Sequence, residues 1–304
     1  MTAVRMEERA TSSSPRHQFA LSVTELLDED PRVALVWAEI SGQFFGDARR
    51  RHPERVVNVG IREQLLVNVG AGMALSGLRP VVHTFGSFLA ERGFEQVKLG
   101  FGHQGVGGVL VGSAGSFDVS YGGRTHQTPG DVALMDTIPG MHVHAPGNAA
   151  EVDRVLREAV TDDGLHYVRL VEQRNSATYG PGTHVVRRGS GAVIVALGPV
   201  LDVVLEATAD RDVTVVYSAS VRPFDGAALR SLVSSPADVV VVEPWLAGTS
   251  AHVVTEALRD VPHRLLSLGV GRVELRHYGS PDEHVAAHGL DAPGLHRSLA
   301  TFLD

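Results

Sequence analysis

The stretch NVGIREQLLVNVGAGMALSG, residues 58–77, passes from a strand pattern to a helix pattern within a few residues. The valine-rich run before it ends at Gly60, which predicts a buried strand followed by a turn. From Ile61 onward apolar residues recur at helical spacing, and small residues leave a surface that another backbone can approach closely. The apolar positions of this predicted helix are Leu65, Leu66, Val69 and Met73. Glu63 falls in the first helical turn, where a carboxylate commonly complements the helix dipole, by about 0.3–1 kcal/mol.

The rest of the chain continues this alternation of buried strands and helices, and 304 residues suit two domains. Residues 17–30 form the first predicted helix, with Phe19, Leu21, Val23, Leu26 and Leu27 directed inward. Pro181 and Gly182 mark a linker, and four further apolar strands follow it. The sequence therefore predicts an α/β protein with two parallel-sheet domains, at residues 17–180 and 186–304, after a disordered tail at residues 1–16.

Composition excludes several classes of protein. Hydrophobic residues make up 43% of the chain, yet no apolar run approaches the roughly 18 residues of a membrane span. The polar start does not resemble a signal peptide, so a soluble cytoplasmic protein is expected. Cysteine is absent, which rules out disulfides, thiolate zinc sites and a cysteine nucleophile. The net charge of -8 argues against a general nucleic-acid surface.

Polar residues follow the predicted strands, and ligands of open α/β sheets collect at the carboxyl ends of strands. Ser41 follows the strand at 33–40, and the loop at 116–131 is irregular, polar and rich in glycine, as functional loops often are. His142 and His144 alternate on a later strand as a pair of metal ligands would. The sequence offers no evident third ligand, so no metal site is predicted in this chain.

The motifs GIREQ, TFGSFLAERGFEQV, GGRTHQ, IPGM, VRPFD, VVEPWLAGTS and YGSPDEHVAAHGLD follow one another in this order. Their order and spacing resemble the carboxyl-terminal half of transketolase over about residues 17–300. The resemblance implies a pyrimidine-binding domain followed by the small C-terminal domain of that family. It also implies thiamine diphosphate as the cofactor.

The resemblance assigns roles to residues that match the family motifs. Glu63 would hydrogen-bond the aminopyrimidine ring nitrogen and favour the imino tautomer, which removes the thiazolium proton. A carboxyl group in this role must be able to hold a proton, which requires burial. Phe85 and Phe88 would stack on the aminopyrimidine, and Gln64 would belong to the surrounding hydrogen-bond shell. His126 would face the donor hydroxyls or carbonyl and donate or move a proton there.

The family holds the cofactor diphosphate through a metal bound at a GDG motif, and no GDG occurs in this sequence. Divalent cations and phosphates need such oxygen ligands and turn amides. The resemblance therefore implies the small subunit of a split transketolase. A separate subunit with the GDG motif would supply the diphosphate half and bind Mg²⁺ or Ca²⁺. An assembly with two copies of each subunit is expected.

The predicted donor site departs from the family pattern. Tyr121, Gly122 and Gly123 stand where typical transketolases have EDG, and Ser113 stands where the preceding strand usually ends in histidine. Asp118 is expected to take over part of the lost acidic role. The expected phosphate or carboxylate contact is Arg169, with Arg174 as the alternative. These departures favour a non-standard donor in a specialised biosynthetic pathway.

Three functions remain open at this stage. The first is ketol transfer from a ketose to an aldehyde. The second is a decarboxylating reaction on a 2-oxo acid, as in deoxyxylulose phosphate synthase or the β subunit of a 2-oxo-acid dehydrogenase. The third is a non-catalytic structural or regulatory subunit. In the second domain, the residues expected to be surface or interface groups are Glu243, His252, His277, His284 and His288.

Overall fold

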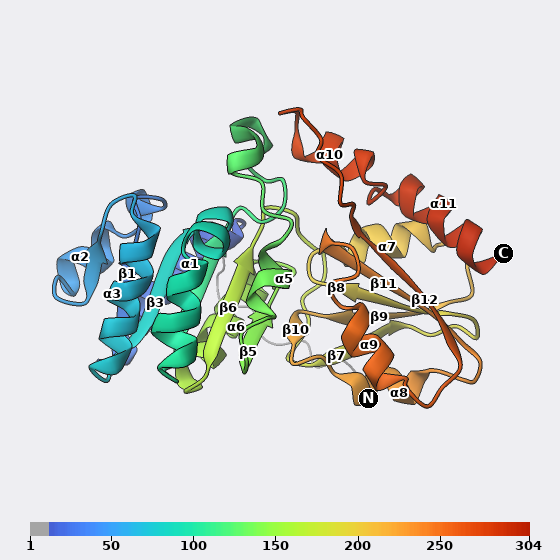
Figure 1. Ribbon diagram of the computed structural model, residues 1–304, viewed down its shortest axis with the longest axis horizontal. Helices are drawn as coiled ribbons and strands as arrows, with labels where there is room; N and C mark the ends of the chain where they lie inside the picture. The colour runs from blue at the N-terminus through green and yellow to red at the C-terminus, as the bar shows by residue number, and fades with distance from the viewer. Residues whose placement is uncertain (1–11) are drawn as a thin grey trace.

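The computed structural model describes residues 12–304, which form two open sheets that lie side by side (Figure 1). In the first domain the strands are β1 (Val33–Trp37), β2 (Val56–Asn58), β3 (Arg79–Phe85), β4 (Gly108–Ser113), β5 (Met141–His144) and β6 (Leu165–Leu170). The α-helices are α1 (Pro15–Glu29), α2 (Gly46–Arg51), α3 (Glu63–Leu75), α4 (Phe94–Gln96), α5 (Asp131–Met135) and α6 (Ala149–Thr161). Short 3-10 turns are η1 (Gly42–Phe44) and η4 (Ser120–Thr125), and π-helical segments are η2 (Phe88–Arg92) and η3 (Val97–His103).

The first sheet has seven strands in the order β10-β5-β6-β4-β3-β1-β2, and only the edge strand β10 runs antiparallel. Helices cover both of its faces, which is why β1 is buried along its whole length. One face packs against α1 and α6 through residues such as Phe19, Val155 and Val168. The other packs against α3 and the π-helical segments through Leu66 and Phe101.

The small residues of α3 let the helix lie close to the first sheet, as the sequence predicts. A side chain at Gly70 would place its Cβ only 2.5 Å from Val82 on β3, so this position requires glycine. The inward prediction for Leu21 is wrong, because this side chain is 41% exposed, and among the apolar positions of α3 Leu65 is 43% exposed. The tail prediction is also wrong in part: residues 12–16 are described, and α1 begins at Pro15 with Ser14 as its N-cap. The remainder of the expected tail lies outside the described residues.

The second domain has a five-stranded sheet in the order β12-β11-β8-β9-β7, with β7 antiparallel. Its strands are β7 (Thr183–Arg187), β8 (Val193–Leu197), β9 (Thr214–Ser218), β11 (Ala237–Leu246) and β12 (His263–Val270). Its helices are α7 (Leu201–Ala207), α8 (Gly226–Leu232), α9 (Ala251–Ala257), α10 (Pro281–Ala287) and α11 (Ala292–Leu303). The observed sheet thus starts at β7, slightly ahead of the expected boundary at residue 186.

A strand from the second domain completes the first sheet. After β9 the chain forms β10 (Ser220–Arg222), which pairs with β5 and lies between the two sheets (Figure 1). Arg222 then forms a bidentate ion pair with Asp136 of the first domain, with both N–O distances at 2.7 Å. The two domains are therefore joined by a shared sheet and not only by the linker. None of the helices within residues 12–304 has the length and apolarity that a membrane span requires.

Candidate active site

Glu63 lies where the carboxyl ends of the first sheet meet the start of α3. The chain leaves β2, turns at Gly60, whose φ is +73°, and begins α3 at Glu63 itself. The side chain is 1% exposed. Its Oε2 accepts a hydrogen bond of 2.7 Å from the Arg92 guanidinium, while Oε1 has no hydrogen-bond partner among the described residues. A buried carboxylate oxygen without a partner is costly, so it marks a place where a ligand donor fits.

Three rings meet beside this carboxylate. Phe85 ends β3 and Phe88 begins η2, and the two rings are perpendicular with centroids 5.7 Å apart. His126 lies against both, at 5.4 Å and 5.0 Å. Arg92 connects this cluster to Glu63, because its guanidinium carbon lies 4.0 Å from the Phe88 ring centroid. The π-helical turn from Phe88 to Arg92 places both residues on the site, and such turns are frequent at functional sites.

A cavity of about 170 Å³ opens next to the ring cluster, at the carboxyl ends of β4 and β6. It is lined by Arg16, Ser113, Ala114, Asp118, Val119, Tyr121, Leu170, Val171 and Glu172. The Arg16 guanidinium carbon is 6.0 Å from the Phe85 ring centroid, so the cavity and the ring cluster are neighbours. The Ser113 hydroxyl is buried and lacks a hydrogen-bond partner within the described chain. The cavity therefore offers one guanidinium, two carboxyl groups and two hydroxyl groups to a polar ligand.

A hydrogen-bond chain positions Arg16. Burial lowers the pKa of His83 to about 3, so this imidazole is neutral. Its Nδ1 is 3.0 Å from the Val111 carbonyl, which identifies Nδ1 as the donor and Nε2 as the acceptor. Nε2 then accepts the Ser41 hydroxyl at 2.9 Å, and the Ser41 oxygen accepts the Arg16 Nε–H at 2.7 Å. Ser41 is 1% exposed, so in this structure it orients Arg16 instead of facing the cavity.

Asp118 has the most strongly shifted carboxyl group of the cavity. Burial raises its pKa to about 7, although the Glu172 N–H donates a hydrogen bond of 2.8 Å to its Oδ2. Since this value lies above the ordinary 3.8, the folded chain binds more protons than the unfolded chain between these two pH values. The stabilising contribution is complete below pH 3.8 and is lost as the pH rises through about 7.

Replacing Asp118 with asparagine should remove this pH dependence. We expect the free energy of unfolding to fall more steeply from about pH 5 to about pH 8 in the wild-type chain than in Asp118→Asn. Denaturant titrations across this range measure the difference. Asp212→Asn is the matched control, because Asp212 is exposed. Parallel pH profiles for the wild type and Asp118→Asn would contradict the assignment.

The other expected contacts lie elsewhere. Gln64 is exposed on α3. Arg169 is 1% exposed, and its Nε donates to Asp131 at 2.8 Å in a buried ion pair, while its Nη1 has no hydrogen-bond partner among the described residues. It also donates to the Ser116 hydroxyl at 2.6 Å. Arg174 is exposed and bonds the carbonyl of Ser13. Within the cavity it is Arg16, not Arg169 or Arg174, that contributes a guanidinium.

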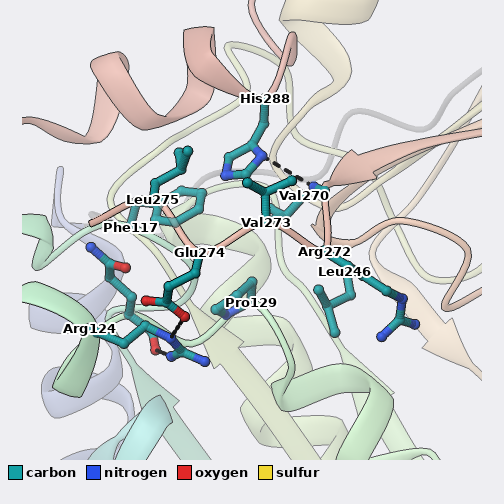
Figure 2. Close-up of a pocket in the computed structure, with 12 residues that line it drawn as sticks. Phe117, Arg124, Pro129, Leu246, Val270, Arg272, Val273, Glu274, Leu275 and His288 are labelled. Carbon is teal, nitrogen blue, oxygen red and sulfur yellow. Dashed lines mark hydrogen bonds and ion pairs between the residues drawn. The ribbon is translucent and has the colours of Figure 1, made fainter. Parts of the chain in front are cut away.

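The second domain holds the loop that carries His126. A pocket of about 310 Å³ lies between this loop and the segment 270–275, and the Arg124–Glu274 ion pair of 3.5 Å lies on its wall. Figure 2 shows the residues that line it. Phe117 stacks on His284 and His288, with centroid distances of 4.6 Å and 5.4 Å. These contacts hold the loop against the second domain.

The same packing corrects the expectation for the second domain. His284 and Glu243 are both 0% exposed, so neither is a surface or subunit-interface group. His284 Nε2 donates a hydrogen bond of 2.8 Å to the Tyr278 carbonyl oxygen. Glu243 accepts the Trp245 indole N–H at 2.8 Å, and burial raises the pKa of Glu243. Both residues therefore make their hydrogen bonds in the interior of the protein.

Two family models match the chain: the transketolase pyrimidine binding domain over residues 13–177 and the transketolase C-terminal domain over residues 182–295. The chain belongs to the transketolase family. An uncharacterized 33.6 kDa protein in the fasciation locus of Rhodococcoides fascians is 46% identical over 291 residues, which cover 94% of this chain and 93% of that protein.

Longer relatives of this transketolase-family chain are 1-deoxy-D-xylulose-5-phosphate synthases. The synthase of Thioalkalivibrio sulfidiphilus is 31% identical over 300 residues, covering 94% of this chain and 46% of the synthase. That of Alkalilimnicola ehrlichii is 33% identical over 307 residues, covering 94% and 47%. The chain thus spans about half the length of these synthases.

Solved structures place the fold in the same family. A split-gene transketolase, described as an inactive beta4 tetramer, aligns with a TM-score of 0.80 and 27% identity, over 96% of this chain and 99% of that chain. The transketolase of Campylobacter jejuni aligns with a TM-score of 0.78 and 15% identity, over 98% of this chain and 48% of that one. The two domains expected from the sequence are therefore confirmed as those of transketolase.

Sequence reasoning about this transketolase-family chain missed two site residues, Arg16 and Arg92. Ser14 and Pro15 form an N-cap and N1 pair that marks the start of a helix, and this signal places Arg16 in α1 and not in a tail. Arg92 lies inside the quoted motif TFGSFLAERGFEQV, but no pattern in the sequence indicates that it reaches Glu63. Only the turn of η2 brings the two side chains together.

Proposed function

We propose that this chain is the pyrimidine-binding subunit of a split thiamine-diphosphate enzyme that transfers a two-carbon ketol unit from a ketose to an aldehyde. The observation that carries the proposal is the buried, unpartnered Oε1 of Glu63 beside the Phe85, Phe88 and His126 rings. An aminopyrimidine is flat and carries ring nitrogens, so it matches a site with one free acid oxygen and aromatic walls.

Each residue has a distinct part in this proposal. The bound cofactor supplies a nucleophilic thiazolium carbon. Glu63 holds or shares a proton at Oε1 with the aminopyrimidine nitrogen, and its burial keeps water from competing for that bond. Phe85 and Phe88 fix the plane of the ring, and Gln64 completes the outer hydrogen bonds once a partner covers α3. His126 donates to, or accepts from, an oxygen of the donor sugar.

Two features support a partner subunit: the missing GDG motif and the exposed apolar side chains around α3. This chain has no GDG motif for a diphosphate-bound Mg²⁺ or Ca²⁺, and its length matches a split-gene subunit. Three apolar side chains on and beside α3 are exposed to solvent: Ile61 is 67% exposed, Leu65 43% and Leu99 47%. We propose that a separate subunit with the GDG motif covers this surface, in an assembly with two copies of each chain.

Purification from the native host tests the partner directly. A tagged chain isolated under mild conditions should bring down a stoichiometric companion with a GDG segment, together with thiamine diphosphate and Mg²⁺, as identified by mass spectrometry. A chain that self-associates without companion or cofactor would favour a non-catalytic structural or regulatory subunit instead.

Arg16 provides the test of the donor class. Because a charge-assisted hydrogen bond contributes about 1.5–3 kcal/mol, Arg16→Met should raise KM for an anionic donor about 10- to 100-fold. The value of kcat should change much less, since Arg16 lies in the neighbouring cavity and does not contact Glu63. Initial rates of the assembled enzyme, with phosphorylated and unphosphorylated donors, measure this split. Arg174→Met is the comparison, and an effect there without one at Arg16 would reject the assignment.

The donor itself is proposed to be non-standard, because Tyr121, Gly122, Gly123 and Ser113 replace the usual acidic and histidine groups. Asp118 is one of the two carboxyl groups that line the cavity, with Glu172. A donor panel in which xylulose 5-phosphate is the best substrate by a wide margin would count against this part.

A second candidate is a decarboxylating reaction on a 2-oxo acid. It is favoured by the similarity to 1-deoxy-D-xylulose-5-phosphate synthases over 94% of this chain. The triplet of Thr125, His126 and Gln127 also matches the synthase pattern. Release of carbon dioxide from pyruvate by the assembled enzyme would favour this reaction over ketol transfer.

A further inference from the structure

Three histidines gather on the face of the first sheet that packs against α6. His142 and His144 occupy alternate positions of β5, so both rings lie on one face. His166 stands directly opposite His142 in the register of β5 and β6, and it adds the third ring to that face. The possible ligand atoms of the three residues all lie within 4.8 Å of one another. The third ligand that the sequence does not reveal thus comes from the neighbouring strand.

Two of the three rings already have the spacing of tetrahedral metal ligands. Zinc binds imidazole nitrogen at about 2.0–2.1 Å, which sets neighbouring ligand atoms about 3.3 Å apart. His144 Nε2 and His166 Nδ1 are 3.1 Å apart. The other nitrogen of His166, Nε2, is 3.0 Å from Oδ1 of Asp162. Metal-bound histidines commonly donate this second N–H to a carboxylate, which fixes the ring and its tautomer.

The protonation state also suits a metal. Burial lowers the pKa of His144 to about 3 and of His166 to about 4, so both imidazoles are neutral near pH 7 with lone pairs available. His144 Nδ1 is buried without a hydrogen-bond partner in the described part of the chain. The cations that face the cluster are Arg154 and Arg79; Arg154 is paired with Glu158, and Asp162 and Asp163 offset Arg79.

We propose that His142, His144 and His166 bind one zinc ion, with Asp162 supporting His166 and the fourth position open to water. The site is separate from Glu63, since β5 and β2 lie toward opposite edges of the first sheet. It joins β5, β6 and the turn after α6, next to the strand β10 that the second domain contributes. Its role is therefore to stabilise this edge and the junction of the two domains.

Zinc titration of the full chain, purified without a histidine tag, tests the site. In competition with a chromogenic chelator, the wild type should bind one Zn²⁺ per chain, and His142→Gln should weaken this binding at least 100-fold. His142 is the best position to change, because its ring nitrogens make no hydrogen bond within the described residues. Asp162→Asn should weaken binding about 10- to 100-fold. His103→Gln, at an exposed ring, should have no effect.

Two further readouts separate a true site from weak surface binding. Zn²⁺ should raise Tm of the wild type but not of His142→Gln, and Co²⁺ should give the absorption of a tetrahedral complex only in the wild type. The proposal is overturned if no stoichiometric Zn²⁺ binds at micromolar concentration, or if His142→Gln binds it as tightly as the wild type. Neither result would bear on the proposed cofactor site.

Discussion

Replacing Glu63 with glutamine should lower kcat of the assembled enzyme by about 10²- to 10⁴-fold, the range expected when a general acid or base is lost. Glutamine keeps the size of the side chain, but its amide cannot hold and return a proton. The carboxylate is 1% exposed and has one unpartnered oxygen, so water has little access to replace it. Steady-state rates with saturating thiamine diphosphate and Mg²⁺ measure the loss.

A structural explanation for that loss can be excluded in the same experiment. Glu63→Gln should still assemble with its partner, and cofactor affinity should fall less than kcat. Glu54→Gln is the matched control, because Glu54 is exposed just before β2 and should leave the rate unchanged. Full activity in Glu63→Gln would reject the proposed catalytic role and favour the non-catalytic function.

Replacing Asp131 with asparagine should lower the free energy of unfolding by about 3–5 kcal/mol, because it leaves the Arg169 charge buried without its partner. Both residues are at most 1% exposed. Asp131 Oδ2 accepts from Arg169 Nε and from the Tyr167 hydroxyl, each at 2.8 Å. Arg169 also donates to Ser116, so the loop that carries Asp118 should loosen as well. Urea unfolding followed by tryptophan fluorescence measures the change.

The double variant Asp131→Asn with Arg169→Met removes the orphaned charge, so it should recover part of the lost stability. Asp238→Asn is the control at an ion pair on the surface, where Arg264 is 59% exposed; there the change should stay below about 1 kcal/mol. Equal losses at the buried and the exposed pair would contradict the argument.

The sequence by itself determined the two α/β domains, because the spacing of apolar residues changes from a strand pattern to a helix pattern within a few neighbouring residues. The same local pattern placed Glu63 at the start of α3. Phe85, Phe88 and His126 could be chosen from the motifs, and the structure brings their rings together.

Only the tertiary structure decided which polar groups face each other. Arg169 lies near a strand end, and its partner Asp131 comes from another element that no local pattern connects to it. Arg16 enters the cavity because α1 begins beside the carboxyl ends of β4 and β6, and His166 meets His142 because β6 lies beside β5. Spacing along a chain fixes the face on which a side chain lies. The partner on that face depends on strand order, which is set by contacts between residues far apart in sequence.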